Sequence, residues 1–221
     1  MQEICGENKK FVVGITGASG IRLGIRFIAH LVRFAENSEI FVVFSNGAKM
    51  VAQYEEKIAD ILGDSRLKSV IDSTDSQGDS PTNPTNRAKI TLCDDSDLDS
   101  PISSGSFGVE STLIIPCSAN TLAKIACGIS DTLITRAALV ALKERKVLLL
   151  APREMPLNAI MLQNMLNLSR IGAIIAPPML SYYANSESLE AMEDFMCGKW
   201  LDCIGIRHNL FPRWGENGDI Q

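Results

Sequence analysis

Residues 11–31 read FVVGITGASGIRLGIRFIAHL, and they set the architecture of the whole chain. The stretch opens with a short apolar run, residues 11–15, which is rich in β-forming residues and too short to span a membrane. Only small residues follow at 16–20, and apolar side chains then recur at helical spacing, at Ile21, Ile25, Ile28, Leu31 and Val32. The pattern predicts a strand, a tight turn and a helix. Such a turn directs free backbone N–H groups and the positive end of the helix dipole at the space above the strand, which suits a phosphate.

This turn does not by itself identify a ligand. The sequence GASG at 17–20 does not fit the pattern G-x-G-x-x-G, and no acidic residue ends the second predicted strand to bind a ribose hydroxyl. Both points disfavour NAD. A tight connection between a strand and a helix, with no ligand, would give the same sequence.

The composition narrows the class of protein. The chain has 221 residues, 46% of them apolar, which suits one domain over 1–221 with one sizeable core. A net charge of −5 suggests neither a nucleic acid nor a membrane surface as partner. The polar N-terminus, MQEICGENKK, predicts no signal peptide, and no apolar run reaches spanning length.

Cysteine and histidine usage points the same way. No two of the six cysteines form a C-x-x-C pair, and most lie in apolar sequence surroundings. This indicates reduced thiols that fill the core of a cytoplasmic protein. With only two histidines, His30 and His208, we expect neither a histidine-based metal centre nor a triad.

Further strands and helices alternate along the chain. Apolar runs predict strands at 39–45, 88–93, 111–116, 147–150 and 172–178, and helical spacing predicts helices at roughly 47–62, 118–126, 131–143, 161–168 and 189–204. Residues 72–86 are almost entirely polar, so we expect a mobile surface loop at about 63–100. The alternation predicts an α/β fold with a doubly wound, mostly parallel sheet, a Rossmann- or flavodoxin-like three-layer sandwich.

Polar and small residues gather where the predicted strands end, at 17–19, 45, 118–121, 153–154 and 183. Open α/β sheets bind their ligands at that edge. Ser118, Asn120 and Thr121 could cap the helix that follows, bind a ligand at its N-terminus, or both. Arg136 and Lys143 lie two helical turns apart on one face, about 10 Å along the axis, as either a solvated stripe or a phosphate site. No serine lies in G-x-S-x-G with a histidine partner, so acyl-transfer chemistry is not expected.

With these residues in view, the chain resembles the flavin prenyltransferases, the UbiX/Pad1 family. The resemblance covers nearly the whole chain except 63 to about 101. It rests on GITGASG (14–20), ISSGSF (102–107), PCSANTLAKIACGISD (116–131), TRAALVALKERKVLLLAPREMP (135–156), IGAIIAPP (171–178) and FPRWGE (211–216). The pattern P-x-SANTLAKIA is shared with flavin-dependent cysteine decarboxylases and indicates only a flavin, whereas LKER and PREMP together with RWGE are more specific.

The resemblance implies a metal-independent enzyme that makes prenylated FMN from reduced FMN and dimethylallyl phosphate. It also implies a UbiD-type decarboxylase as recipient of the product, a link to ubiquinone biosynthesis, and a homo-oligomer, possibly a dodecamer, with sites between subunits. The implied FMN contacts are Gly17, Ala18, Ser19, Ser45, Ser118, Ala119, Asn120, Thr121 and Arg153. The prenyl phosphate is expected at Arg136, Lys143, Tyr183 and Lys199, and the catalytic residues are expected to be Ser19, Glu55, Lys143, Glu154 and Trp214.

These residue types suit the implied chemistry. Cations and a tyrosine hydroxyl would stabilise the charge on the leaving phosphate, and the ring of Trp214 would line the path of an allylic cation. Glu154 or the released phosphate could accept the proton lost from flavin C6. The family usually has arginine where this chain has Lys199, which keeps the charge but loses the bidentate fork.

Two other functions stay open at this point. A cysteine-decarboxylase-like enzyme would need a catalytic histidine after the first strand–helix unit, where neither His30 nor His208 fits. A non-catalytic subunit that binds and delivers flavin would share most of the same residues.

Overall fold

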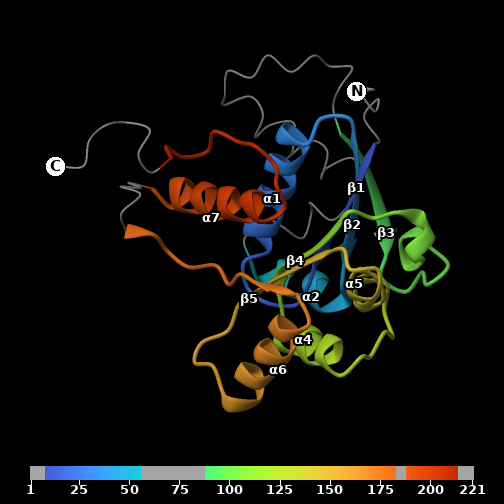
Figure 1. The fold of residues 1–221 in the computed structure, drawn as a ribbon. Helices are drawn as coiled ribbons and strands as arrows, with labels where there is room; N and C mark the ends of the chain where they lie inside the picture. Colours follow the sequence, from blue (N-terminus) through green and yellow to red (C-terminus); the bar gives the residue numbers. More distant parts are fainter. Residues whose placement is uncertain (1–7, 56–87, 183–187, 214–221) are drawn as a thin grey trace.

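The computed structural model describes residues 8–55, 88–182 and 188–213, and these form a six-stranded sheet covered by helices (Figure 1). The strand order is β3-β2-β1-β4-β5-β6, and every neighbouring pair is parallel. The strands are β1 (Lys9–Ile15), β2 (Ser38–Phe44), β3 (Lys89–Asp94), β4 (Ser111–Cys117), β5 (Val147–Pro152) and β6 (Ile174–Ile175). This is the doubly wound Rossmann order, so the predicted fold class is confirmed.

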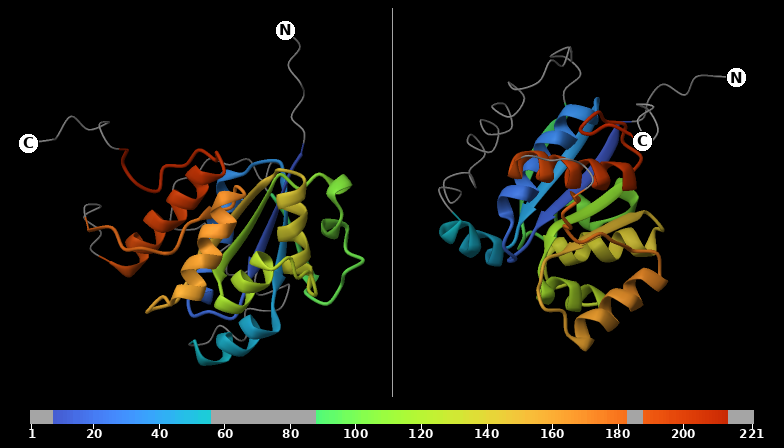
Figure 2. Two further views of the ribbon diagram at one scale, coloured as in Figure 1. Left: turned by 60° about the horizontal axis from the view of Figure 1, so that its bottom comes forward. Right: turned by 90° about the vertical axis from the view of Figure 1, so that its left-hand side faces the viewer.

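Helices cover both faces of the sheet (Figure 2). They are α1 (Ile21–Phe34), α2 (Asn46–Tyr54), α4 (Ala119–Ala126), α5 (Leu133–Lys143), α6 (Ala159–Arg170) and α7 (Leu189–Cys203). Two 3₁₀ turns, η3 (Pro101–Ser103) and η4 (Gly105–Phe107), lie between β3 and β4. The side chains of α1 and α7 belong to the core on one face, and those of α4, α5 and α6 belong to the core on the other.

The alternation of buried side chains along the strands divides them between these two cores. Val13 of β1 and Val42 of β2 pack toward α1, whereas Val12 and Val43 pack toward α4 and α5. Because all four side chains are buried, the central strands read as continuous apolar runs. The sheet is therefore the middle layer of a three-layer structure, as predicted.

Several element boundaries differ from the sequence-based expectation. The last strand is only Ile174–Ile175, because the prolines at 177 and 178 cannot donate ladder hydrogen bonds. Helix α5 begins at Leu133, two residues late, since Thr132 serves as its N-cap. The strand expected at 88–93 is confirmed as β3. Of the mobile loop predicted over about 63–100, residues 63–87 lie outside the described residues, whereas 88–100 form β3 and hydrogen-bonded turns, so the prediction is wrong for that part.

The cysteines only partly follow the expectation of a core role. Cys117 and Cys197 are buried, but Cys127 and Cys203 are exposed, so the core-filling role is wrong for these two. All five cysteines in the described part of the chain are free of disulfides. No helix in that part of the chain has the length and apolar character needed to cross a membrane.

Candidate functional site

A pocket of about 400 Å³ opens at the carboxyl ends of the strands. Its lining includes residues that directly follow β1, β2, β4 and β5, namely Gly17, Ser45, Ser118, Ala119, Asn120, Thr121 and Glu154. The strand order reverses between β1 and β4, which is the switch point where open α/β sheets bind ligands. The structure therefore brings most of the expected flavin contacts together around one cavity.

Two glycines let the first two connections approach each other. A Cβ placed on Gly17 would lie 2.9 Å from the Cα of Gly47, which is closer than real Cβ atoms come to backbone. Gly47 is likewise tight against Gly17. Because a side chain at Gly17 would collide with backbone and one at Gly47 would be tight against it, the turn after β1 and the start of α2 form one continuous backbone wall of the pocket.

Thr16 joins the turns after β1 and β4. Its hydroxyl donates to the carbonyl of Pro116 at 2.9 Å and accepts from the amide of Ser118 at 2.7 Å, and the residue is buried. The start of α4 is thus fixed to the end of β1 by a satisfied buried hydroxyl.

Helices α2 and α4 present open N-termini to the pocket. Ser45 Oγ accepts from the amide of Ala48 at 3.1 Å, and Ser118 Oγ accepts from that of Thr121 at 3.2 Å, so each serine is an N-cap. Across the described residues, no acceptor is found for the amides of 46, 47, 119 and 120. Two converging sets of free N–H groups form a site for an anion.

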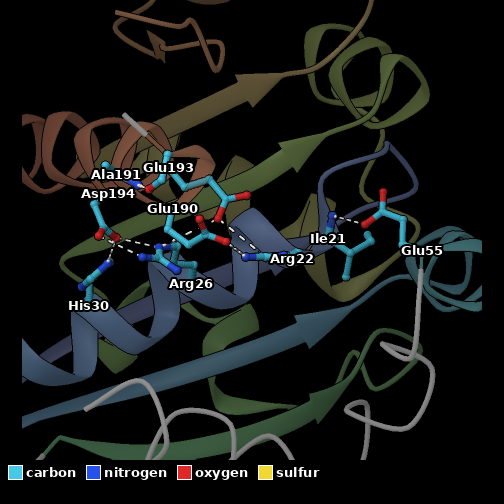
Figure 3. A network of polar contacts seen from close by, with 10 residues as sticks. Ile21, Arg22, Arg26, His30, Glu55, Glu190, Ala191, Glu193 and Asp194 are labelled. Carbon is cyan, nitrogen blue, oxygen red and sulfur yellow. Dashed lines mark hydrogen bonds and ion pairs between the residues drawn. The ribbon is translucent and has the colours of Figure 1, made fainter. Parts of the chain in front are cut away.

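The start of α1, by contrast, is already occupied. The amides of Gly20 and Ile21 donate to Glu55 Oε1 at 2.6 Å and Oε2 at 3.0 Å, and Figure 3 shows the contact of Glu55 with Ile21. The phosphate site suggested by the first turn is thus filled at α1 by a carboxylate of the protein. The sequence around Glu55 is typical of a solvated helix face. No local sequence pattern predicts its contact with the Gly20 amide, because the two residues are 35 positions apart.

Pocket residues that the sequence did not single out include Asp95, just after β3, and Lys124 of α4. Asp95 is 9% exposed, and burial raises the pKa of its carboxyl even though hydrogen bonds from the Ile134 amide and the Thr132 hydroxyl act in the opposite direction. Lys124 Nζ lies 2.7 Å from Asp131 Oδ2. The pocket thus holds one lysine beside its open helix ends and two acids, Asp95 and Glu154.

Other expected FMN contacts lie near the pocket without lining it. Ala18 is buried and Ser19 is exposed, both on the turn after β1. The backbone N–H of Arg153 donates to the carbonyl of Cys117 at 3.2 Å, and its side chain is exposed. Glu154, which does line the pocket, is exposed and its carboxylate accepts from the amide of Met155 at 3.2 Å.

The expected phosphate ligands are not gathered around this pocket. Arg136 is exposed and donates to the carbonyl of Ser103 at 3.3 Å, while Lys143 pairs with Glu144 at the far end of α5. Lys199 is exposed on α7. The expectations for Tyr183 and Trp214 lie outside the described residues.

A network of charged side chains holds α7, which carries Lys199, against α1 (Figure 3). Arg26 Nε lies 2.6 Å from Asp194 Oδ1, which His30 Nε2 also approaches to 2.6 Å. Burial opposes ionisation of Asp194, but the hydrogen bonds from His30 and Arg26 outweigh it and hold the pKa of that carboxyl well below its usual range. Next to it, burial raises the pKa of Glu193.

The fold and this pocket define a class of protein, which the comparisons specify. Residues 2–200 match the Flavoprotein family, and the chain belongs to it. The flavin prenyltransferase UbiX of Helicobacter pylori (strain J99) is 46% identical over 94% of this chain and all of its own length. Within the Flavoprotein family, the chain therefore belongs with the UbiX flavin prenyltransferases.

Solved structures agree with this assignment. The crystal structure of AnUbiX in complex with FMN and dimethylallyl pyrophosphate has a TM-score of 0.79 and 35% identity, covering 94% of this chain and 98% of its own. A dodecameric FMN-dependent UbiX-like decarboxylase from Escherichia coli O157:H7 has a TM-score of 0.76 and 35% identity, covering 93% and 98%.

Proposed function

We propose that this chain is a flavin prenyltransferase that moves the dimethylallyl group of dimethylallyl phosphate onto N5 and C6 of reduced FMN. The observation that carries the proposal is the pocket at the switch point, where most of the expected flavin contacts converge in a chain that matches UbiX enzymes over nearly its whole length. FMN is a substrate here, and prenylated FMN is the product.

The open helix ends support a place for the flavin phosphate. The free amides at the starts of α2 and α4 can donate to its oxygens, and the dipoles of both helices favour its charge. Lys124 adds a cation on the same lining. Because Glu55 already fills the start of α1, we place the phosphate between α2 and α4.

The position of the cations on α5 supports a site completed by a second subunit. Thr132 lines the pocket, whereas Lys143 lies eleven residues further along the same helix, about 16 Å away by helical rise. Because that distance exceeds the reach of a lysine side chain, we propose that Lys143, and with it Arg136 on the same face of α5, holds the leaving phosphate in a pocket formed with another subunit. Helix α6 and the segments beside it expose apolar side chains that a neighbouring copy could cover, among them Met155, Ile160, Leu162, Ile171 and Met179.

Within such a composite site the remaining residues receive the roles expected from the sequence. Lys199, Tyr183, Arg136 and Lys143 would stabilise the charge on the leaving phosphate, and Arg153 would contact the flavin. Glu154 lies on the pocket wall, where a carboxylate can accept the proton that leaves flavin C6. Ser19, Glu55 and Trp214 complete the proposed catalytic set.

The cysteine-decarboxylase alternative loses support from the histidines. His30 is engaged with Asp194 on α1, and the His208 side chain is buried beside Phe211 and Asp202. Neither lines the pocket.

We propose that a UbiD-type decarboxylase receives the prenylated FMN. We also propose that this protein is located in the cytoplasm.

Release of inorganic phosphate tests the proposal against non-catalytic flavin delivery. The protein should release phosphate from dimethylallyl phosphate only when reduced FMN is present. If oxidised FMN supports the same release, or reduced FMN supports none, the proposal is wrong. Running dimethylallyl diphosphate in parallel shows which prenyl donor is used.

A further inference from the structure

The four helices that begin at the pocket edge fall into two groups. The first amides of α2 and α4 have no acceptor among the described residues, whereas those of α1 and α5 donate to acidic residues from distant parts of the chain. Glu55 fills the start of α1 and Asp95 fills the start of α5. Asp95 belongs to a segment to which neither the sequence nor the proposed function assigns a role.

Asp95 contacts α5 at two adjacent amides. Its main-chain carbonyl accepts from the amide of Leu133 at 2.8 Å, and its Oδ1 accepts from that of Ile134 at 3.0 Å. The third amide, that of Thr135, donates to the N-cap Thr132 at 3.4 Å. The N-terminus of α5 is thereby satisfied by the protein, and its dipole is already met by a carboxylate.

These bonds act on a wall of the flavin pocket. Thr132, Ile134 and Thr135 all line the cavity. On its other side, Ile134 packs against β1 so closely that a Cβ on Gly14 would lie 3.1 Å from Ile134 Cγ2. Ile134 is thus held at its side chain by β1 and at its amide by Asp95. This bond links the end of strand β3 to the pocket wall.

We propose that Asp95 is a positioning residue of the flavin site: it fixes the first turn of α5, and with it the pocket wall at 132–135, to the end of β3. Because Asp95 accepts from the first amides of α5, the N-termini that remain open to the flavin phosphate are those of α2 and α4. The proposal takes the identity of the ligand from the proposed function, and its test uses binding of oxidised flavin, which needs no turnover.

The test compares Asp95→Ala and Asp95→Asn with Asp94→Ala as the matched control. Asp94 is the preceding residue, but its exposed carboxylate serves only the local turn at Ser96 in the described structure. The side-chain amide oxygen introduced by Asp95→Asn can accept from the Ile134 amide as the carboxylate does. Loss of that bond in Asp95→Ala should weaken flavin binding roughly fivefold to tenfold, while Asp95→Asn and Asp94→Ala should stay within about twofold of the parent.

Titration with both FMN and riboflavin separates a wall from a phosphate contact. If Asp95 positions the wall, Asp95→Ala should weaken both flavins by the same factor, and amide hydrogen exchange at 133–135 should accelerate while that of β4 stays unchanged. Parent-like flavin binding by Asp95→Ala, or a loss confined to FMN, would overturn the proposal.

The asparagine variant decides the matter if Asp95→Ala does not fold. Asp95→Asn with the parent's melting temperature but flavin binding weakened about tenfold would show that the carboxylate charge, not the bond to Ile134, is what matters, and would contradict the proposal. Flavin binding by Asp95→Asn that equals that of the parent would support the proposal. Failure of phosphate release with intact flavin binding would sink the proposed function and leave this inference standing.

Discussion

Glu55 shows how one side chain can change the interpretation of a motif. The turn after β1 has the sequence of an anion site, yet the first two amides of its helix are bound by Glu55 at 2.6 and 3.0 Å. A carboxylate from the end of α2 thus does locally what a phosphate would do. The expected role of Glu55 at the reacting atoms stays a prediction, and it can be separated from this capping role.

Substituting Glu55 by glutamine and by alanine separates the two roles. Glu55→Ala removes both acceptors from α1 and should lower the unfolding free energy by about 1 kcal/mol, as for loss of an N-cap. Glu55→Gln keeps an acceptor and should lose less. If Glu55 also acts at the reacting atoms, the glutamine variant should keep its stability but lose prenylation by about tenfold or more. A fully active Glu55→Gln would restrict the residue to capping.

At the scale of elements, α7 matters because it carries Lys199. Two neighbouring acidic residues of α7 face α1, and their pKa values are shifted in opposite directions. Asp194 is hydrogen-bonded to Arg26 and His30. Glu193 is buried and its Oε2 has no hydrogen-bond partner in the described structure, with Arg22 Nε and Arg26 Nε at 3.7 and 3.9 Å as longer ion pairs. The pKa of Asp194 is lowered and that of Glu193 is raised.

The two acids should give opposite pH dependences of stability. Because the pKa of Asp194 is lower in the folded state than its ordinary value of 3.8, its contribution is fully present above that pH and is lost as pH falls below it. Asp194→Asn should therefore lower stability by about 2 kcal/mol at pH 7, with the difference narrowing in acid.

Glu193 should behave in the reverse way. Because the pKa of Glu193 is raised above its ordinary value of 4.5, its ionisation destabilises the fold as pH rises through that window. Glu193→Gln should match the parent below about pH 4.5 and melt at a higher temperature at pH 7. Melting curves from about pH 3 to 8 check both predictions, and parallel pH profiles for the two variants would contradict them.

Lys199 on the same helix gives a third prediction. A lysine offers one point charge where an arginine offers two parallel hydrogen bonds, so Lys199→Arg should lower the KM for dimethylallyl phosphate by about tenfold at most. FMN affinity should not change, because Lys199 does not line the pocket. If Lys199→Arg and Lys199→Ala both match the parent in KM and kcat, Lys199 takes no part in binding.

How far the sequence could predict this structure depends on the range of each signal. Strand runs and helix spacing are local, so the order of elements, and the strand ends carrying Ser45 and Ser118, were predictable. The roles of Glu55 and Asp95 are not local, because their partners lie 34 to 39 residues away and an acid at a helix or strand end has no distinctive pattern. The length of β6 was overestimated because the apolar run IGAIIAPP contains prolines, which end the hydrogen-bonded pairing of the strand.

At the scale of the whole molecule, the distance between the pocket and Lys143 predicts a shared site. We also still predict that residues 1–221 form a single domain. If each site combines the flavin pocket of one copy with the α5 cations of another, a Lys143→Ala subunit and a subunit with a blocked flavin pocket, such as Gly17→Val, should both be inactive alone.

Mixing these two variants tests the shared site. Gly17→Val would force a side chain against the backbone of Gly47. Co-expressed with Lys143→Ala, it should restore part of the activity, because mixed oligomers contain some sites with both halves intact. Activity no greater than that of either variant alone, in oligomers shown to contain both, would place Lys143 outside a shared site.

The measurement that bears most directly on the proposed function is mass spectrometry of the flavin itself. Reduced FMN is incubated anaerobically with the protein and dimethylallyl phosphate, and the flavin is then recovered. Formation of bonds at N5 and C6 with release of phosphate predicts a flavin heavier by one C₅H₈ unit, absent when protein or prenyl donor is omitted. Recovery of unmodified FMN from protein that demonstrably binds both substrates would contradict the assignment as a flavin prenyltransferase.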